Sequence, residues 1–332
     1  MGRCLLMNDR TASIVEAVAD QYGYKVETIV QMKTVYGLVT EQGRRYIWKF
    51  TRPHDTELRL SQLNRISARL YDVGIPTAGP LPKIRAGGFI AVLSTGEQGY
   101  LQPWMDGRHL KLDIRQERLT AVATVAQFHR WAVPPGVQLP MFNAPGGILP
   151  LRLKNKQAAL VHALRLAGDK VPGLRHISPE ILRQADEAVK AGTYLEQTLP
   201  VELRFCHRDL APHNLLWLND GRVGIIDFDR SGWDDPLLDL LQLFNHTLFL
   251  DEPSEDCLPE LVEVYSRNQG LTEQRVWIFK KIAGFPEHLT RALVEWVRAG
   301  FPPDKVIRVE LAWDKERLRQ RLLQGVMTVE NP

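Results

Sequence analysis

The sequence has little cysteine, little net charge and no long apolar run, and each absence excludes a class of protein. Its three cysteines, Cys4, Cys206 and Cys257, are too scattered for a metal site and indicate a reducing, cytoplasmic compartment. The net charge of +3 is too small to indicate nucleic acid or a membrane as the main partner. No segment has the length and apolarity of a membrane span, and no signal peptide is recognisable. The composition is otherwise that of a globular protein, whose 332 residues would fill two lobes or domains.

One polar motif stands out in residues 207–229, which read HRDLAPHNLLWLNDGRVGIIDFD. Two short apolar runs flank the Asn-Asp-Gly-Arg segment at 219–222, and Asp-Gly supplies the positive φ angles of a tight hairpin. This hairpin would return Asp227 to the level of Asn214, so that a carboxylate and an amide oxygen converge as ligands for Mg²⁺. Asp209, five residues before Asn214, would face an attacking hydroxyl. The order and spacing predict phosphoryl transfer from ATP.

Each of these residues has an ordinary alternative explanation. Aspartate and asparagine are common in turns, and one of them alone would indicate no more than a turn. The combination, with apolar strands in the gaps, favours the kinase-like interpretation because a motif gains weight from its structural context.

The N-terminal part predicts a small sheet that could hold the nucleotide. Three strands are expected at 28–33, 36–40 and 45–50. Lys49, near the end of the third, could carry its ammonium to the α- and β-phosphates, although lysine is also ordinary on an exposed strand. Apolar residues at helical spacing predict a helix over 55–73. Glu57 in its first turn would form an ion pair with Lys49, or would simply interact favourably with the helix dipole.

A glycine-rich phosphate loop is missing, and the first turn of the sheet carries only Gly37. A further hairpin is expected from 89–93 and 99–104. After this hairpin the chain leaves the sheet past Gln102, Trp104 and Met105. In a two-lobed kinase this segment is the hinge, whose backbone groups would meet the adenine. An ordinary surface turn is the alternative.

The rest of the chain is predicted to be helical. Helices are expected at 116–131 and 151–166, after Ser178-Pro179 and after Asp235-Pro236. The last of these is apolar nearly all round and should be buried. It carries Asp239, which would need donors from backbone amides or from His207. Cys206 lies in an apolar stretch and is expected to be buried packing.

Several stretches carry a family resemblance. Residues 205–214, 226–229 and 235–240 resemble the aminoglycoside phosphotransferase and choline kinase superfamily. Within it the chain is most similar to the spore-coat protein S (CotS) family of kinase-like proteins, on the order of short motifs at 104–108, 126–129 and 285–289.

The resemblance implies an α+β, protein-kinase-like fold of two lobes. Residues 1–105 would form a small antiparallel-sheet N-lobe that binds the nucleotide, and residues 106–332 a mainly helical C-lobe. It implies ATP and Mg²⁺ as cofactors, Asp209 as the base, Asn214 and Asp227 as metal ligands, and Lys49 as the phosphate-binding residue. It also implies a role in the spore coat, with other coat proteins as partners.

Two positions depart from related patterns. Arg208 stands where small-molecule kinases often have glycine, and Asp229 where protein kinases have glycine. Asp229 could contact metal or substrate, or could cap the following turn. Asp239 follows Asp227 by only twelve positions, which leaves no room for an activation loop. Arg208 would therefore lack a phosphorylated partner, and the acceptor should be a small hydroxyl compound or a polymer end.

Three functions are compatible with the sequence. The first is an active phosphotransferase. The second is a pseudokinase that serves in spore-coat assembly, which the missing glycine loop favours. The third is an unrelated globular or nucleic-acid-binding protein, which the mild charge disfavours.

Overall fold

The computed structural model describes residues 9–324 except 86, 138, 143–146, 169, 172, 199–201 and 251–252. The chain forms two compact units. The first comprises Met1–His109, Trp131–Phe142 and Asn214–Asp229, and the second Leu110–Arg130, Asn143–His213 and Arg230–Pro332. The first unit extends past the lobe boundary expected at residue 105, and it also takes in the ribbon that carries the predicted metal ligands.

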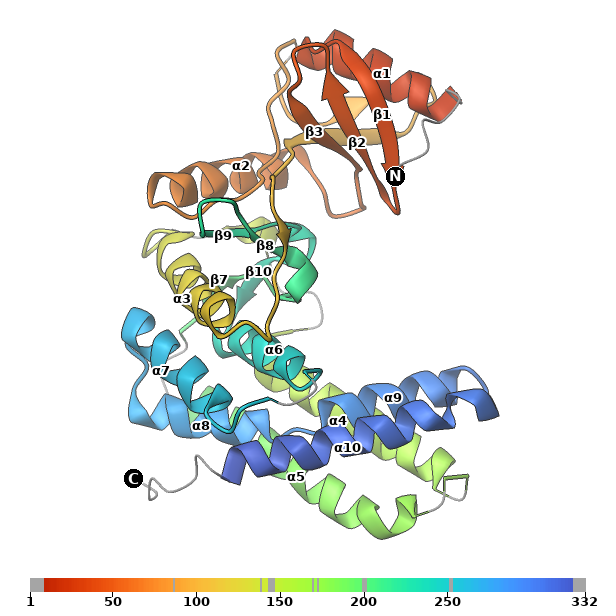
Figure 1. Ribbon diagram of the computed structural model, residues 1–332, viewed down its shortest axis with the longest axis vertical. Helices are drawn as coiled ribbons and strands as arrows, with labels where there is room; N and C mark the ends of the chain where they lie inside the picture. Colours follow the sequence, from red (N-terminus) through yellow and green to blue (C-terminus); the bar gives the residue numbers. More distant parts are fainter. Residues whose placement is uncertain are drawn as a thin grey trace. The chain divides into compact units, whose positions relative to one another are not determined.

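The first unit contains a five-stranded antiparallel sheet in the order β1-β2-β3-β5-β4 (Figure 1). Its strands are β1 (Val26–Met32), β2 (Val35–Thr40), β3 (Arg45–Phe50), β4 (Ala91–Val92) and β5 (Gln98–Pro103). The predicted strands and hairpin are confirmed to within a few residues. The helix α1 (Asp9–Tyr22), which was not predicted from the sequence, packs against this sheet, and its Ile14 and Val18 belong to the same buried apolar cluster as Trp48.

The helix expected over 55–73 is α2 (Glu57–Asp72). It begins two residues later because the Thr56 hydroxyl caps it, accepting from the Arg59 N–H at 3.2 Å. Its buried side is apolar, with Leu60, Leu63 and Leu70. The short 3₁₀ helix η1 (Pro140–Phe142) packs against it.

A three-stranded ribbon completes the first unit, in the order β6-β8-β9. It consists of β6 (Arg108–His109), β8 (Leu215–Trp217) and β9 (Val223–Ile225). Gly221 has φ +80°, which the tight turn requires. The Ile226 N–H donates to the Asn214 carbonyl at 3.0 Å, so the hairpin closes at the level of Asn214 as predicted.

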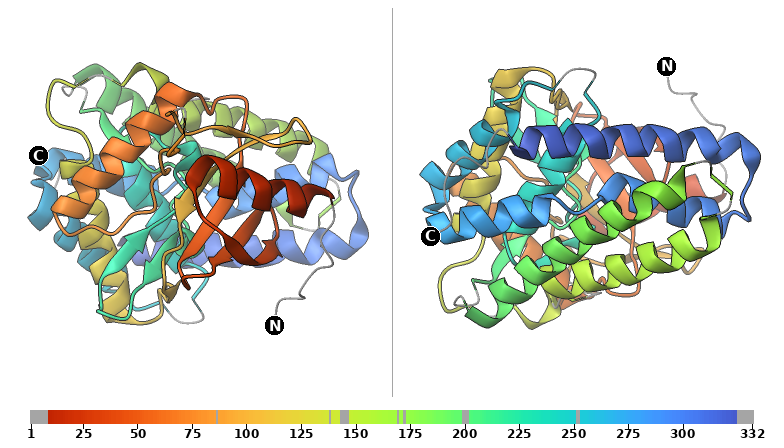
Figure 2. Two further views of the ribbon diagram at one scale, coloured as in Figure 1. Left: turned by 90° about the horizontal axis from the view of Figure 1, so that it is seen from above. Right: turned by 90° about the horizontal axis from the view of Figure 1, so that it is seen from below.

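The second unit is mainly helical. Its helices are α3 (Arg115–Trp131, whose last residue belongs to the first unit), α4 (Leu149–Ala167), α5 (Leu174–Thr198), α6 (Leu237–Thr247), α7 (Cys257–Gln269), α8 (Glu273–Ala283), α9 (Glu287–Arg298) and α10 (Val306–Gln324). The helix α4 packs on α5 and α9, and α9 packs on α10 (Figure 2). The strands β7 (Arg204–Cys206) and β10 (Gly232–Asp234) pair antiparallel, and η4 (Pro303–Lys305) is a 3₁₀ turn. Two further 3₁₀ turns, η2 (Pro212–Asn214) and η3 (Phe228–Arg230), contain residues of both units. No helix among the described residues is long and apolar enough to cross a membrane.

Two helix starts can be compared with expectation. The helix expected after Asp235-Pro236 is α6, which is buried nearly all round, and the Asp235 carboxylate accepts from the Leu237 N–H at 2.9 Å. The start expected at Ser178-Pro179 was wrong. Ser178 does not cap a helix but donates its hydroxyl to the Leu174 carbonyl at 2.6 Å inside α5, which runs through Pro179.

Candidate nucleotide site and catalytic loop

A cavity of about 370 Å³ lies within the first unit, a size suited to a small ligand. Its lining includes the predicted nucleotide residues Lys49, Gln102, Trp104 and Met105 and the predicted metal ligand Asp227. The other lining residues are Met32, Thr34, Val35, Ile47, Arg52, Ala78, Pro103, Gly107, His109, Leu216, Ile226 and Asp229. The lining thus combines an apolar set suited to a flat base with a charged set suited to phosphates and a cation.

Strand alternation explains why β3 supplies both core and cavity. Tyr46 and Trp48 join the apolar core shared with α1, whereas Ile47 and Lys49 line the cavity. Gly37 also has a different role from the one expected. It lies inside β2 rather than in the first turn, and a Cβ there would meet the Trp104 ring at 2.7 Å. This glycine lets Trp104 approach the sheet.

Lys49 is buried between two carboxylates of the segment that directly follows the ribbon. Its Nζ donates to Asp227 Oδ1 at 2.8 Å and to Asp229 Oδ1 at 2.7 Å. Arg52 pairs with the second oxygen of Asp229 at 2.6 Å. Burial alone would lower the pKa of Lys49, but Tyr100 and the two carboxylates outweigh it and raise the pKa. The ionised form of Lys49 is thus favoured by its surroundings in the cavity.

The ion pair expected between Lys49 and Glu57 was wrong. The Glu57 carboxylate accepts from the backbone N–H groups of Phe89 (2.6 Å) and Ile90 (2.9 Å). A Cβ at Gly88 would lie within 3 Å of that carboxylate, so the loop passes directly over it. Glu57 thus stabilises the loop at residues 88–90, and the carboxylates that pair with Lys49 belong to the segment after β9.

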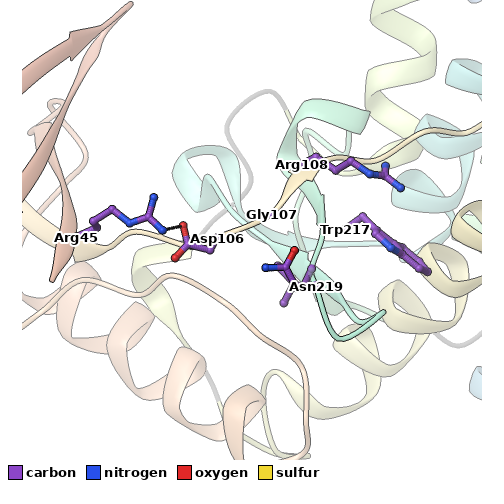
Figure 3. Close-up of a pocket in the computed structure, with 7 residues that line it drawn as sticks. Arg45, Asp106, Gly107, Arg108, Trp217 and Asn219 are labelled. Carbon is purple, nitrogen blue, oxygen red and sulfur yellow. Dashed lines mark ion pairs between the residues drawn. The ribbon is translucent and has the colours of Figure 1, made fainter. Parts of the chain in front are cut away.

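A second cavity, of about 640 Å³, lies beside the expected hinge (Figure 3). Arg45 and Asp106 form an ion pair at its edge, and Trp217 and Asn219 come from the ribbon. Gly107 lines both cavities, and a Cβ there would meet the Trp217 carbonyl and the Leu218 side chain at 2.9 Å. The backbone after β5 therefore runs closely against the ribbon.

The segment that carries Asp209 belongs to the second unit, where Asp239 of α6 holds it. The backbone N–H groups of His207 and Arg208 donate to the Asp239 carboxylate at 2.7 and 2.8 Å. His129 Nε2 lies 2.9 Å from the same carboxylate. Burial opposes the charge, but the hydrogen bond from His129 and the neighbouring donors lower the pKa of Asp239. The expected backbone donors to Asp239 are confirmed, and His129 is a further partner that was not predicted.

Gln242, one turn further along α6, holds the other side of the loop. Its amide oxygen accepts from the Leu210 N–H at 2.8 Å, and its amide nitrogen donates to the Arg208 carbonyl at 2.9 Å. Backbone bonds therefore flank Asp209 on both sides. The Asp209 side chain itself is 48% exposed, with Arg230 Nε 3.6 Å from it.

Arg208 has an internal partner in place of the phosphorylated residue that protein kinases supply. Its Nε lies 3.0 Å from Asp234 Oδ2, and it donates to the Gly147 carbonyl at 3.1 Å. Asp234 also accepts from the Leu149 N–H at 2.7 Å, at the start of α4. Arg208 and Asp227 both have positive φ angles, +67° and +65°, which are costly for residues with a side chain. Such strain is concentrated at functional positions.

Burial raises the pKa of Asp234 to about 6, from 3.8 when exposed. Between these values the folded protein keeps a proton that the unfolded chain has lost, so stability falls as pH rises through that window. We expect the free energy of unfolding of the wild type, relative to Asp234→Asn, to fall by about 2 kcal/mol from pH 4 to pH 7. Urea unfolding at both pH values measures it. A rise instead would mean that Arg208 outweighs burial.

The predicted site residues thus fall into two groups. One cavity of the first unit is lined by Lys49, Gln102, Trp104, Met105 and Asp227. Asn214 directly precedes β8, and Asp227 follows β9, which pairs with β8. Asp209 belongs to the second unit. The roles of these residues stay predictions. Sequence reasoning did not give roles to Arg52, Gln242 and Asp234, because isolated polar residues carry no spacing signal.

The profile of a family described as "Phosphotransferase enzyme family" matches residues 33–277. No curated protein sequence matches the chain significantly. Solved structures that resemble it include an aminoglycoside phosphotransferase from Alicyclobacillus acidocaldarius (15% identity, TM-score 0.71, 98% of this chain and 96% of that chain covered). Others are the amicoumacin kinase hAmiN with AMP-PNP and Ca²⁺ (16%, 0.62, 94% and 92%) and the choline kinase LicA from Streptococcus pneumoniae (16%, 0.51, 94% and 100%). The predicted fold, a small antiparallel sheet with a mainly helical remainder, is confirmed.

Proposed function

Because the chain belongs to the phosphotransferase enzyme family, we propose that it transfers the terminal phosphoryl group of ATP, with Mg²⁺, to a hydroxyl group of a small molecule. The observation that carries this proposal is the cavity in which Lys49 lies between Asp227 and Asp229 while Gln102, Trp104 and Met105 line the same space.

The residues of this cavity fit the parts of ATP. Backbone groups around Gln102 to Met105 would meet the adenine, and Lys49 would bind the phosphates. Asn214 and Asp227 would hold Mg²⁺, because an amide oxygen and a carboxylate are the hard donors that this ion takes. The Asp227 side chain is 41% exposed, which suits a ligand that must reach an incoming cation. When bound, the ion would neutralise charge on the phosphates.

Asp209 would accept the proton of the attacking hydroxyl. Its carboxylate needs a fixed direction, because an oxygen out of line with the phosphorus gains little from the base. The bonds from Asp239 and Gln242 to the backbone on either side of Asp209 supply that rigidity.

We propose a small hydroxyl compound as the acceptor. The names of the similar structures mention an aminoglycoside phosphotransferase, an amicoumacin kinase and a choline kinase. The short interval from Asp227 to Asp239, which contains η3 and β10, leaves no activation loop to receive a peptide. A polymer end remains a second form of the same chemistry.

Titration calorimetry with ATP, with and without Mg²⁺, tests the nucleotide site. We expect binding that strengthens at least about tenfold when Mg²⁺ is present and that Asp227→Asn loses, since the ion bridges protein and phosphates. The exposed Asp220→Asn on the same ribbon is the matched control and should bind like the wild type. A screen for ATP consumption against amino alcohols, sugars and aminoglycosides then identifies the acceptor.

A second function is a pseudokinase of the spore-coat protein S branch that serves in coat assembly. The absence of a glycine-rich loop over the phosphates favours it, and the order of short motifs supports the branch. The same calorimetry separates the two functions. Binding of ATP that Mg²⁺ does not change would favour the assembly role.

A further inference from the structure

Lys49 differs from the expected kinase lysine in where its partners come from. The carboxylate in the first turn of α2, Glu57, is occupied by the N–H groups of Phe89 and Ile90. The carboxylates that pair with Lys49, those of Asp227 and Asp229, lie on the segment that follows β9. The lysine is thus anchored by the ribbon that also offers a metal ligand.

The two carboxylates are not equivalent. Asp227 is 41% exposed, whereas Asp229 is 8% exposed and lies 2.7 Å from Lys49 Nζ. A carboxylate that binds a divalent cation has its charge and lone pairs engaged, so it holds a neighbouring ammonium less strongly. If Asp227 bound Mg²⁺, Asp229 would be the carboxylate that stays paired with Lys49.

The segment that carries Asp229 is itself held firmly. Arg52 pairs with the other carboxylate oxygen of Asp229 at 2.6 Å. The buried guanidinium of Arg59 donates to the carbonyls of Phe228 and Asp229, each at 3.2 Å, and packs over the Phe142 ring at 4.2 Å. The helix α2 therefore contributes the Arg59 guanidinium, which holds the backbone of residues 228–229 in place.

We propose that Asp229 is a positioning residue that keeps Lys49 directed at the nucleotide phosphates, in the place that an α2 glutamate would otherwise take. The inference rests on the proposed phosphotransferase function. Asp229 acts through Lys49 and touches neither phosphate nor acceptor. A movement of α2 would shift Arg59, then the 228–229 backbone that Arg59 holds, and so the position of Lys49.

The first test measures the pair in protein free of nucleotide and metal. Melting temperatures are compared for Lys49→Met, Asp229→Asn and the double variant, with Asp220→Asn as the exposed control of the same chemical change. We expect Asp229→Asn to lower the melting temperature by about 5 °C, because a buried ammonium loses a partner. The double variant should melt at or above Asp229→Asn. Additive losses would overturn the proposal.

The second test separates positioning from metal binding. In Asp229→Asn we expect the maximal rate of ATP consumption to fall by roughly 10–100-fold, as misplacement of a positioning group does. The KM for ATP and the Mg²⁺ concentration for half-maximal rate should each change less than about threefold. A large rise in the Mg²⁺ requirement alone would overturn the proposal and make Asp229 a direct ligand.

These outcomes also separate the inference from the proposed function. If the wild type binds and consumes ATP and Asp229→Asn matches it in rate, only the role of Asp229 fails. If the wild type binds no ATP, the proposed function fails and the positioning role fails with it, while the melting comparison still reports whether the pair exists.

Discussion

Replacement of Asp209 by asparagine is expected to lower turnover by roughly 10²–10⁴-fold while ATP binding stays close to that of the wild type. Asparagine has nearly the same shape but cannot accept the proton of an attacking hydroxyl. The loop backbone should not move, because Asp239 and Gln242 hold it through main-chain groups rather than through the Asp209 side chain. Initial rates with the acceptor found by the screen, together with calorimetry, measure both quantities.

The matched control for this variant is Asp220→Asn, an exposed carboxylate in the turn of the ribbon, which should keep full turnover. Turnover of Asp209→Asn near that of the wild type would exclude Asp209 as the base. A parallel loss of ATP binding would instead indicate that the loop had moved.

Replacement of Asp239 by alanine is expected to have the largest effect on stability, a loss of roughly 3–5 kcal/mol in the free energy of unfolding. The side chain is fully buried, and its removal leaves two backbone N–H groups and His129 without their acceptor. Because those N–H groups belong to His207 and Arg208, the loop before Asp209 should also loosen and turnover should fall. Urea unfolding and initial rates measure the two effects.

The exposed Asp256→Ala at the start of α7 provides the comparison, because its carboxylate makes no cap hydrogen bond and its loss should change stability little. A stability of Asp239→Ala within about 1 kcal/mol of the wild type would contradict the support role that its contacts indicate.

The elements with a strong local signal were predictable. The turn at 219–222 between two apolar runs predicted the β8–β9 hairpin, and α6 was predicted from its apolar residues and the Asp-Pro before it. Lys49 in the cavity followed from its strand and from the motif downstream. The helix α1 was not predicted, since its apolar face finds its partners, such as Trp48, only across the sheet.

The partners of charged side chains were harder to predict, because any carboxylate at a suitable distance along the chain can serve. Glu57 was expected to meet Lys49, yet it meets the backbone of a loop 32 residues away, and Lys49 meets Asp229 across 180 residues. Arg208 was expected to lack a phosphorylated partner, and the sequence did not indicate that Asp234 would pair with it. Such pairings depend on which surfaces the packed chain brings within 3 Å.

The sequence by itself therefore determined the strands of the sheet, the β8–β9 hairpin and, through a family resemblance, the class of fold, because strand alternation and turn residues act over a few neighbouring residues. Tertiary structure alone decided which carboxylate pairs with Lys49, which one binds the 89–90 loop, and that His129 joins the backbone donors of Asp239. These choices follow from burial: a charge removed from water must take whatever partner the packed chain places beside it.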